Sequence, residues 1–153
     1  MKEEDSNKVS IEKDINARDD ELLSYKDEYI DLSSQGLKIK KYYFPTLSEK
    51  IIPINRIKNI NLIELGIANG KYKMWGLNLN FIYYHLDGKR SKKTHVITLE
   101  EEGNFLTIGI TPEDPKKCFD VLRYLISDMK KEKSNKLYED NEQLLKIRKQ
   151  KVN

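Results

Sequence analysis

Seven short apolar segments, separated by turn residues, most constrain what this chain can fold into. Several of them alternate apolar and polar residues, as a half-buried strand does. Between them lie clusters of glycine, proline, serine, asparagine and aspartate, which favour turns. The segments are residues 28–33, 37–44, 50–54, 57–64, 77–86, 94–99 and 105–110. Strands at this spacing predict a mainly β domain, either a seven-stranded antiparallel barrel or an orthogonal sandwich.

An amphipathic helix is predicted directly after the last strand. Asp114 precedes Pro115, which favours Asp114 as the N-cap and Pro115 as the first helical residue. Apolar residues then recur at three- and four-residue spacing: Cys118, Phe119, Leu122, Leu125, Ile126 and Met129. We therefore predict a helix over residues 115–131 that caps one open end of the barrel, and a break at residues 132–135.

Polar extensions flank the predicted domain. The chain has 153 residues, of which 38% are hydrophobic and 35% charged, and the apolar residues concentrate in the middle. This distribution predicts one domain over residues 28–131. Residues 1–27 are predicted to be a polar extension, partly helical (11–26) or disordered. Residues 132–153 are predicted to be a charged tail, either frayed or forming a helix over 136–149 that binds a partner.

The sequence favours a soluble, cytoplasmic protein. The single cysteine, Cys118, allows neither an intramolecular disulfide nor a multi-cysteine metal site. No apolar run approaches the ~18 residues that a membrane span requires. The first residues have no apolar stretch of the kind found in signal peptides.

Four local sequences, taken in order, add a family resemblance. They are Lys41-Tyr42-Tyr43-Phe44-Pro45, Lys50-Ile51-Ile52-Pro53-Ile54, Gly70-Lys71-Tyr72-Lys73-Met74-Trp75-Gly76 and Ile110-Thr111-Pro112-Glu113-Asp114-Pro115. Together they resemble a family of small bacterial pleckstrin-homology-like proteins of unassigned function. The resemblance covers residues 28–129 and implies a pleckstrin-homology-like fold, with no cofactor and no chemistry to carry over.

The lipid-binding position of pleckstrin-homology domains is not reproduced. That position uses a basic residue on the first strand and further basic residues on the second. Here Lys38 and Lys40 fit the second-strand positions, but the first strand carries Glu28 and Asp31. Phosphoinositide binding at this position is therefore not expected.

A basic hairpin is the strongest charge feature. Asp87-Gly88 is typical of a hairpin turn, so residues 77–86 and 94–99 are predicted to pair. The turn is either a solubilising tip or a contact for an acidic protein surface, an anionic membrane or RNA. The candidate residues for an anionic partner are Lys38, Lys40, Lys89, Arg90, Lys92 and Lys93.

A second candidate surface is apolar. Trp75 stands in a glycine-flanked loop, where its ring either seals a barrel mouth or anchors a partner. Ile82 and Tyr84 lie on the strand face opposite Phe81, so that strand is apolar on both sides. We take Trp75, Ile82 and Tyr84 as the candidate apolar anchor, because an apolar outer face needs a cover.

No residue pattern favours catalysis. His85 and His95 lie on the two arms of the predicted hairpin, but the further ligands that a zinc site needs are not nearby. Cys118 is predicted to be a core thiol, and Ser91 lies in a basic turn, so neither is expected to act as a nucleophile beside a histidine base. The consecutive carboxylates Glu100, Glu101 and Glu102 are predicted to form a solvated turn, and the glycines fit no phosphate loop.

These observations predict a non-enzymatic adaptor that binds another protein. The alternative is a peripheral membrane module that uses the basic hairpin to bind anionic phospholipid. Nucleic acid is a weaker candidate, because recognition by stacking needs exposed aromatic residues on a strand face. No metal, cofactor or small-molecule substrate is expected.

Overall fold

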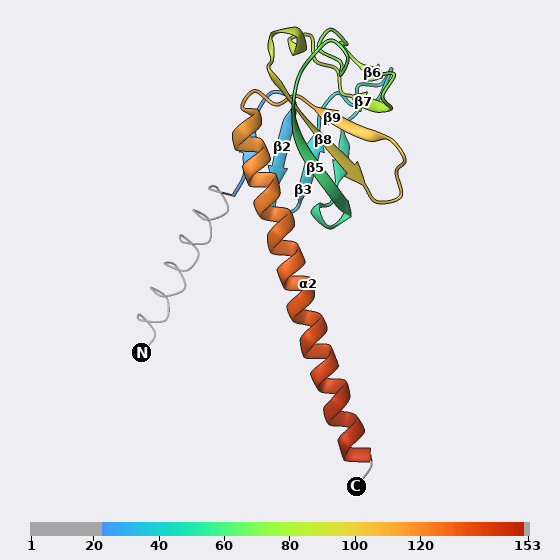
Figure 1. The fold of residues 1–153 in the computed structure, drawn as a ribbon, viewed down its shortest axis with the longest axis vertical. Helices are drawn as coiled ribbons and strands as arrows, with labels where there is room; N and C mark the ends of the chain where they lie inside the picture. Colours follow the sequence, from blue (N-terminus) through green and yellow to red (C-terminus); the bar gives the residue numbers. More distant parts are fainter. Residues whose placement is uncertain (1–22, 152–153) are drawn as a thin grey trace, which may run out of the picture.

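Residues 23–151 are described by a computed structural model, in which two β-sheets are followed by one long helix (Figure 1). The strands are β1 (Tyr25–Lys26), β2 (Ile30–Ser33), β3 (Gly36–Ile39), β4 (Lys50–Ile52), β5 (Ile57–Glu64), β6 (Gly76–Leu77), β7 (Ile82–Tyr84), β8 (His95–Glu101) and β9 (Thr107–Ile110). The helix is α2 (Pro115–Lys151), and two short 3-10 turns are η1 (Ile54–Arg56) and η2 (Arg90–Lys92). Most of the helical stretch predicted over residues 11–26 lies outside the described residues.

The first sheet is an antiparallel meander in the order β1-β2-β3-β4. Its register places Ile30 opposite Ile39 and Leu37 opposite Ile52. These four side chains are fully buried, whereas the alternate residues Asp31 and Lys38 are only half-buried. The sheet therefore has the alternation expected of strands with one face on the core.

The second sheet has the order β5-β8-β9-β7-β6 and contains one parallel pair, β7 with β9. Because β9 lies between β7 and β8, the hairpin predicted from Asp87-Gly88 is wrong. The two segments are joined instead by a loop that contains η2. His85 and His95 consequently do not sit opposite each other: His85 contacts Thr111, and His95 contacts Thr94.

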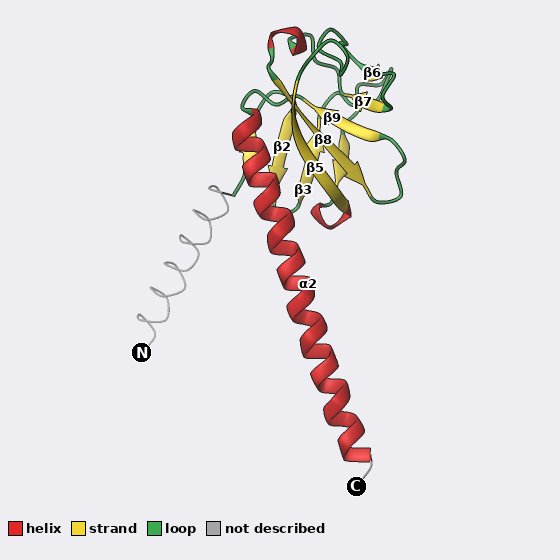
Figure 2. Cartoon of the chain, viewed as in Figure 1, coloured by secondary structure: helices red, strands yellow, loops and turns green. Residues whose placement is uncertain are grey.

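The core lies between the two sheets and the first half of α2. Buried residues from both sheets and from α2 form one apolar cluster, which includes Leu32, Ile97, Ile108, Cys118 and Leu122. Figure 2 shows the strands gathered at one end of the molecule, with α2 running away from them. The mainly β class and the C-terminal helix are confirmed, but the strands of residues 23–151 form two sheets and no closed barrel.

The long strand predicted over residues 77–86 is divided into β6 and β7. Asn78 Oδ1 accepts hydrogen bonds from the backbone N–H groups of Asn80 (3.0 Å) and Ile82 (2.9 Å). Phe81 takes a φ of 59°, which turns the chain. An asparagine side chain that bonds its own backbone in this way favours a turn over a strand.

Helix α2 begins as predicted and continues much further. The Asp114 carboxylate accepts a hydrogen bond from the Lys117 N–H (3.0 Å), so Asp114 is the N-cap. The predicted break at residues 132–135 is wrong, because that stretch contains neither proline nor glycine and helix propagation needs no apolar stripe. Residues 130–150 are exposed along their whole length. Among the helices of residues 23–151, none is long and apolar enough to cross a membrane.

Candidate functional site

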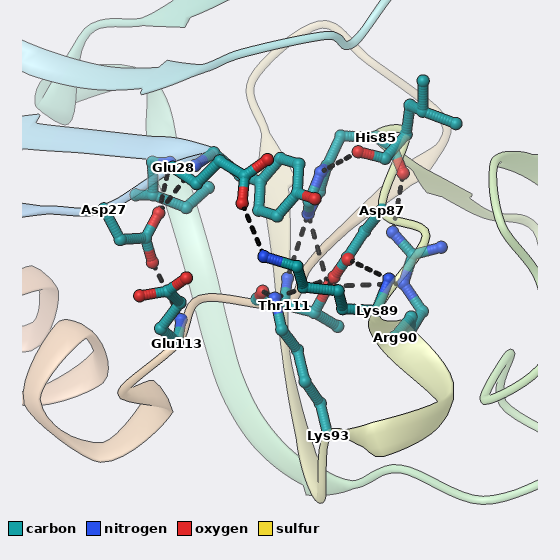
Figure 3. Close-up of polar contacts among 12 residues, drawn as sticks. Asp27, Glu28, His85, Asp87, Lys89, Arg90, Lys93, Thr111 and Glu113 are labelled. Carbon is teal, nitrogen blue, oxygen red and sulfur yellow. Dashed lines mark hydrogen bonds and ion pairs between the residues drawn. The ribbon is translucent and has the colours of Figure 1, made fainter.

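Two of the predicted surface cations point into the protein (Figure 3). Arg90 is 1% exposed, and the Lys93 side chain is 14% exposed. Lys93 Nζ lies 2.8 Å from Asp87 Oδ2, and Arg90 donates to the backbone oxygens of His85 (2.6 Å) and Lys73. The expectation that the loop exposes four cations is therefore wrong for Arg90 and Lys93.

Asp87 is the centre of a group of inward-pointing side chains. We call this group the inward cluster, and its members are His85, Asp87, Arg90, Lys93 and Thr111. The Asp87 carboxylate accepts hydrogen bonds from Lys93 Nζ, from Thr111 Oγ1 (2.6 Å) and from the Lys89 N–H (2.8 Å). Burial by itself would raise the pKa of Asp87, but these donors lower it below its usual value. Burial lowers the pKa of Arg90 to about 10, so Arg90 stays charged at neutral pH. The cluster fixes the β7–β8 loop onto the end of β9.

His85 is a neutral acceptor within the inward cluster. Its Nε2 accepts a hydrogen bond from the Thr111 N–H (3.2 Å), so Nε2 carries no proton. The proton then lies on Nδ1, which is 3.2 Å from the Leu86 carbonyl oxygen. Burial, followed by the nearby Arg90 charge, holds the pKa of His85 well below its usual value. We assign His85 a structural role.

This pKa shift predicts a loss of stability at mildly acidic pH. As the pH is lowered from 6.5 to 4.5, the unfolded chain binds a proton at His85 that the folded chain does not bind. The free energy of unfolding therefore decreases as the pH is lowered. We expect a slope of up to about 1.4 kcal/mol per pH unit, measured by urea denaturation. The variant His85→Gln should lose this slope, and an unchanged stability of the parent across the window would contradict the assignment.

Three of the other four candidate cations have a partner within the protein. Lys38 pairs with Glu49 (3.3 Å), and Lys89 pairs with Glu28 (3.1 Å). Lys40 Nζ donates to the Asp27 carbonyl oxygen (3.0 Å). Of the six cations named from the sequence, Lys92 is exposed with no side-chain partner among the described residues. The structure does not bring these six residues together as one binding surface.

The three residues of the candidate apolar anchor, Trp75, Ile82 and Tyr84, do not form one exposed surface. Ile82 and Tyr84 are buried, and a Cβ added at Gly109 would clash with the Tyr84 ring, so β9 covers this ring closely. Trp75 is half-buried, and its ring packs edge-on against Phe44 at 4.0 Å between centroids. The exposed apolar side chains of this segment are Leu79 and Phe81, which lie in the turn between β6 and β7 and not on a strand face.

Several cations without side-chain partners among residues 23–151 lie between β5 and α2. Two adjoining cavities of about 520 Å³ and 340 Å³ lie there and share Lys58, Ile126 and Lys130. We call this region the β5–α2 groove. The larger cavity is lined by Lys58, Asn59, Ile60, Arg123, Ile126, Ser127, Lys130, Lys131 and Ser134, and the smaller one adds Ile54, Asn55, Ile57, Glu102, Met129 and Lys133.

The groove combines an apolar floor with a cationic rim. Ile126 is nearly buried and Ile60 is half-buried, and both belong to or pack against the main core cluster. The side chains of Lys58, Lys130 and Lys131 are exposed and make no ion pair or hydrogen bond within residues 23–151. No acidic residue lines the larger cavity. This arrangement suits an anionic ligand that also carries apolar groups.

Comparison with known proteins found no matching family model, no significant match to a curated protein and no significant match to a solved structure. The groove is therefore interpreted from its own residues.

The single cysteine, Cys118, lies in the core and not in the groove. Burial raises the pKa of the Cys118 thiol, which is fully buried in the core cluster, so it stays protonated. Within residues 23–151, no three His, Cys, Asp or Glu side chains converge in a way that could hold a metal ion.

One signal in the sequence could have found half of the groove. Arg123, Ser127, Lys130 and Ser134 are spaced i, i+4, i+7 and i+11, so they share one helix face beside the apolar stripe. The β5 half could not be found in this way, because the approach of α2 to Lys58 depends on tertiary packing.

Proposed function

We propose that this chain is a non-enzymatic, pleckstrin-homology-like binding module that engages an acidic segment of another protein in the β5–α2 groove. The observation that carries this proposal is the set of unpartnered lysines, Lys58, Lys130 and Lys131, around the apolar floor of Ile60 and Ile126. Cations that have no internal partner are free to pair with a ligand. The family resemblance and the two sheets with a C-terminal helix support this fold assignment, whereas the nine strands of residues 23–151 and the parallel pair of β7 with β9 depart from the seven-stranded antiparallel barrel that was expected.

Among anionic ligands, an acidic protein segment fits the groove best. The groove is recessed between a strand and a helix, and its floor offers apolar contact that a phosphate group cannot use. Its lining contains no aromatic residue on which a nucleic-acid base could stack. The alternative membrane module relied on the basic hairpin, and two of its four cations, Arg90 and Lys93, are turned inward.

An adaptor needs a second surface, and the distal half of α2 supplies a candidate. Beyond residue 134 the helix exposes five large apolar residues: Leu137, Tyr138, Leu144, Leu145 and Ile147. We place the module in the cytoplasm, for which the support is that its single cysteine is buried and can form no intramolecular disulfide.

Charge reversal in the groove tests the proposal. The probe is a fluorescein-labelled eight-residue peptide of alternating valine and glutamate, and its binding is measured by fluorescence anisotropy. We expect the triple variant Lys58→Glu, Lys130→Glu, Lys131→Glu to bind at least about tenfold more weakly than the parent. We also expect parent binding to weaken as salt is raised, because the rim is exposed.

The matched control reverses three exposed lysines outside the groove, Lys92, Lys116 and Lys146. It changes the net charge equally and should bind the peptide as the parent does. Equal weakening in the two triple variants would show a non-specific charge effect and refute the groove. Binding of the parent to phosphatidylserine vesicles, without binding to the peptide, would refute a protein partner.

A further inference from the structure

We propose that the acidic segment binds as an added β-strand along the free edge of β5, extending the sheet to the order ligand-β5-β8-β9-β7-β6. This inference rests on the proposed function and specifies how the groove is used. It names the partner by its chemistry: an extended protein segment in which apolar and acidic residues alternate.

The free edge of β5 is the first reason. β5 ends the strand order of its sheet, so one of its edges pairs with β8 and the other has no partner strand within residues 23–151. An unpaired edge presents a row of N–H and C=O groups that can pair with another chain. The larger cavity is lined by Lys58, Asn59 and Ile60, so it lies beside this strand.

The length of β5 sets it apart from the other sheet edges. β5 has 8 residues, whereas the edge strands β1, β4 and β6 have 2, 3 and 2. Proteins commonly protect their edges by keeping edge strands short. A register shift between Ile57 and Asn59 and the charge on Lys58 protect only the start of β5. The rest of this edge is left long and open.

The helix wall supplies recognition of side chains. Successive side chains of a strand point to opposite faces, so an alternating segment has one apolar and one acidic side. Its apolar side can contact the floor of Ile60 and Ile126, while its carboxylates can be reached by the long side chains of Lys58, Lys130 and Lys131, which line the same cavity. Main-chain pairing would then supply affinity, and the cations would select an acidic sequence.

Backbone methylation of the peptide tests strand addition. In a strand, the N–H groups of odd and even residues point to opposite edges, so methylation of all valine nitrogens blocks one edge and methylation of all glutamate nitrogens blocks the other. The two methylated peptides have the same length and charge. We expect one of them to bind the full-length protein at least about tenfold more weakly than the unmodified peptide and the other to keep its affinity within about threefold.

A second measurement follows the protein. On addition of the unmodified peptide, alternate backbone amides of β5 should become protected from hydrogen exchange, because those that point to the free edge gain a partner. Equal effects of the two methylations, or unchanged exchange along β5, would overturn strand addition. In that case, if the parent still binds the unmodified peptide and the groove triple variant does not bind it, the proposed function stands and only strand addition is refuted. Failure of the unmodified peptide to bind would overturn both.

Discussion

Replacing Leu122 with aspartate is expected to leave the protein unfolded at room temperature. Leu122 is fully buried in the cluster that joins both sheets to α2. Truncation of such a side chain costs about 2–5 kcal/mol, and an unpaired carboxylate in its place adds several kcal/mol more. A domain of ordinary stability, about 5–15 kcal/mol, does not tolerate this loss. Near-ultraviolet circular dichroism and thermal melting measure it.

The same substitution elsewhere on the helix is the control. Leu144 lies on α2 as well, but it is 56% exposed and distant from the sheets. Leu144→Asp should therefore melt as the parent does. A folded Leu122→Asp variant with the parent's melting temperature would show that α2 does not hold the two sheets together.

Replacing Asp87 with alanine is expected to destabilise the fold by about 3–5 kcal/mol. Asp87 is 1% exposed, and its removal leaves Lys93 and Arg90 buried without a negative charge nearby. Thr111 and the Lys89 N–H also lose their acceptor. Urea denaturation should show this as a lower midpoint with an unchanged slope.

Two further variants separate the charge effect from the loss of volume. Adding Lys93→Met to Asp87→Ala removes one uncompensated cation, so the double variant should recover part of the stability. Glu28→Gln breaks the exposed contact with Lys89 and should leave the midpoint where it was. If Asp87→Ala unfolds at the same urea concentration as the parent, the inward cluster does not stabilise the loop.

The local elements of the fold could be predicted from the sequence, but their order in the sheet could not. Asp114 and Pro115 predict the start of α2 correctly, and each of the seven predicted segments overlaps a strand, although residues 77–86 contain parts of two strands. The insertion of β9 between β7 and β8 depends on a parallel pairing between residues 82–84 and 107–109. No local turn signal specifies a pairing between segments so far apart.

One turn, at residues 78–81, explains why the buried and exposed faces of residues 77–86 were predicted the wrong way round. Reading these residues as one strand placed Phe81 inside and Tyr84 outside. The side-chain bonds of Asn78 and the positive φ of Phe81 reverse this, so Tyr84 is buried and Phe81 is exposed. A turn that an asparagine makes inside an apolar run cannot be distinguished from a strand by periodicity alone.

Whether a cation is free or has a partner could not be predicted from the sequence. The cations of residues 89–93 were visible, but their partners lie elsewhere in the chain: Glu28 for Lys89, and Thr111 and the Lys73 carbonyl for Arg90. Whether a lysine is free depends on such tertiary contacts. Only the structure separates the neutralised lysines from those of the β5–α2 groove.

Mapping the bound peptide by nuclear magnetic resonance tests the central claim most directly. The ¹⁵N-labelled protein is titrated with the unlabelled peptide of alternating valine and glutamate, and shifts of the backbone amides are followed. We expect the largest shifts at residues 58–60 and 123–134, on the two walls of the groove. Shifts confined to residues 89–93 or 70–76, or a spectrum that does not change, would contradict the account.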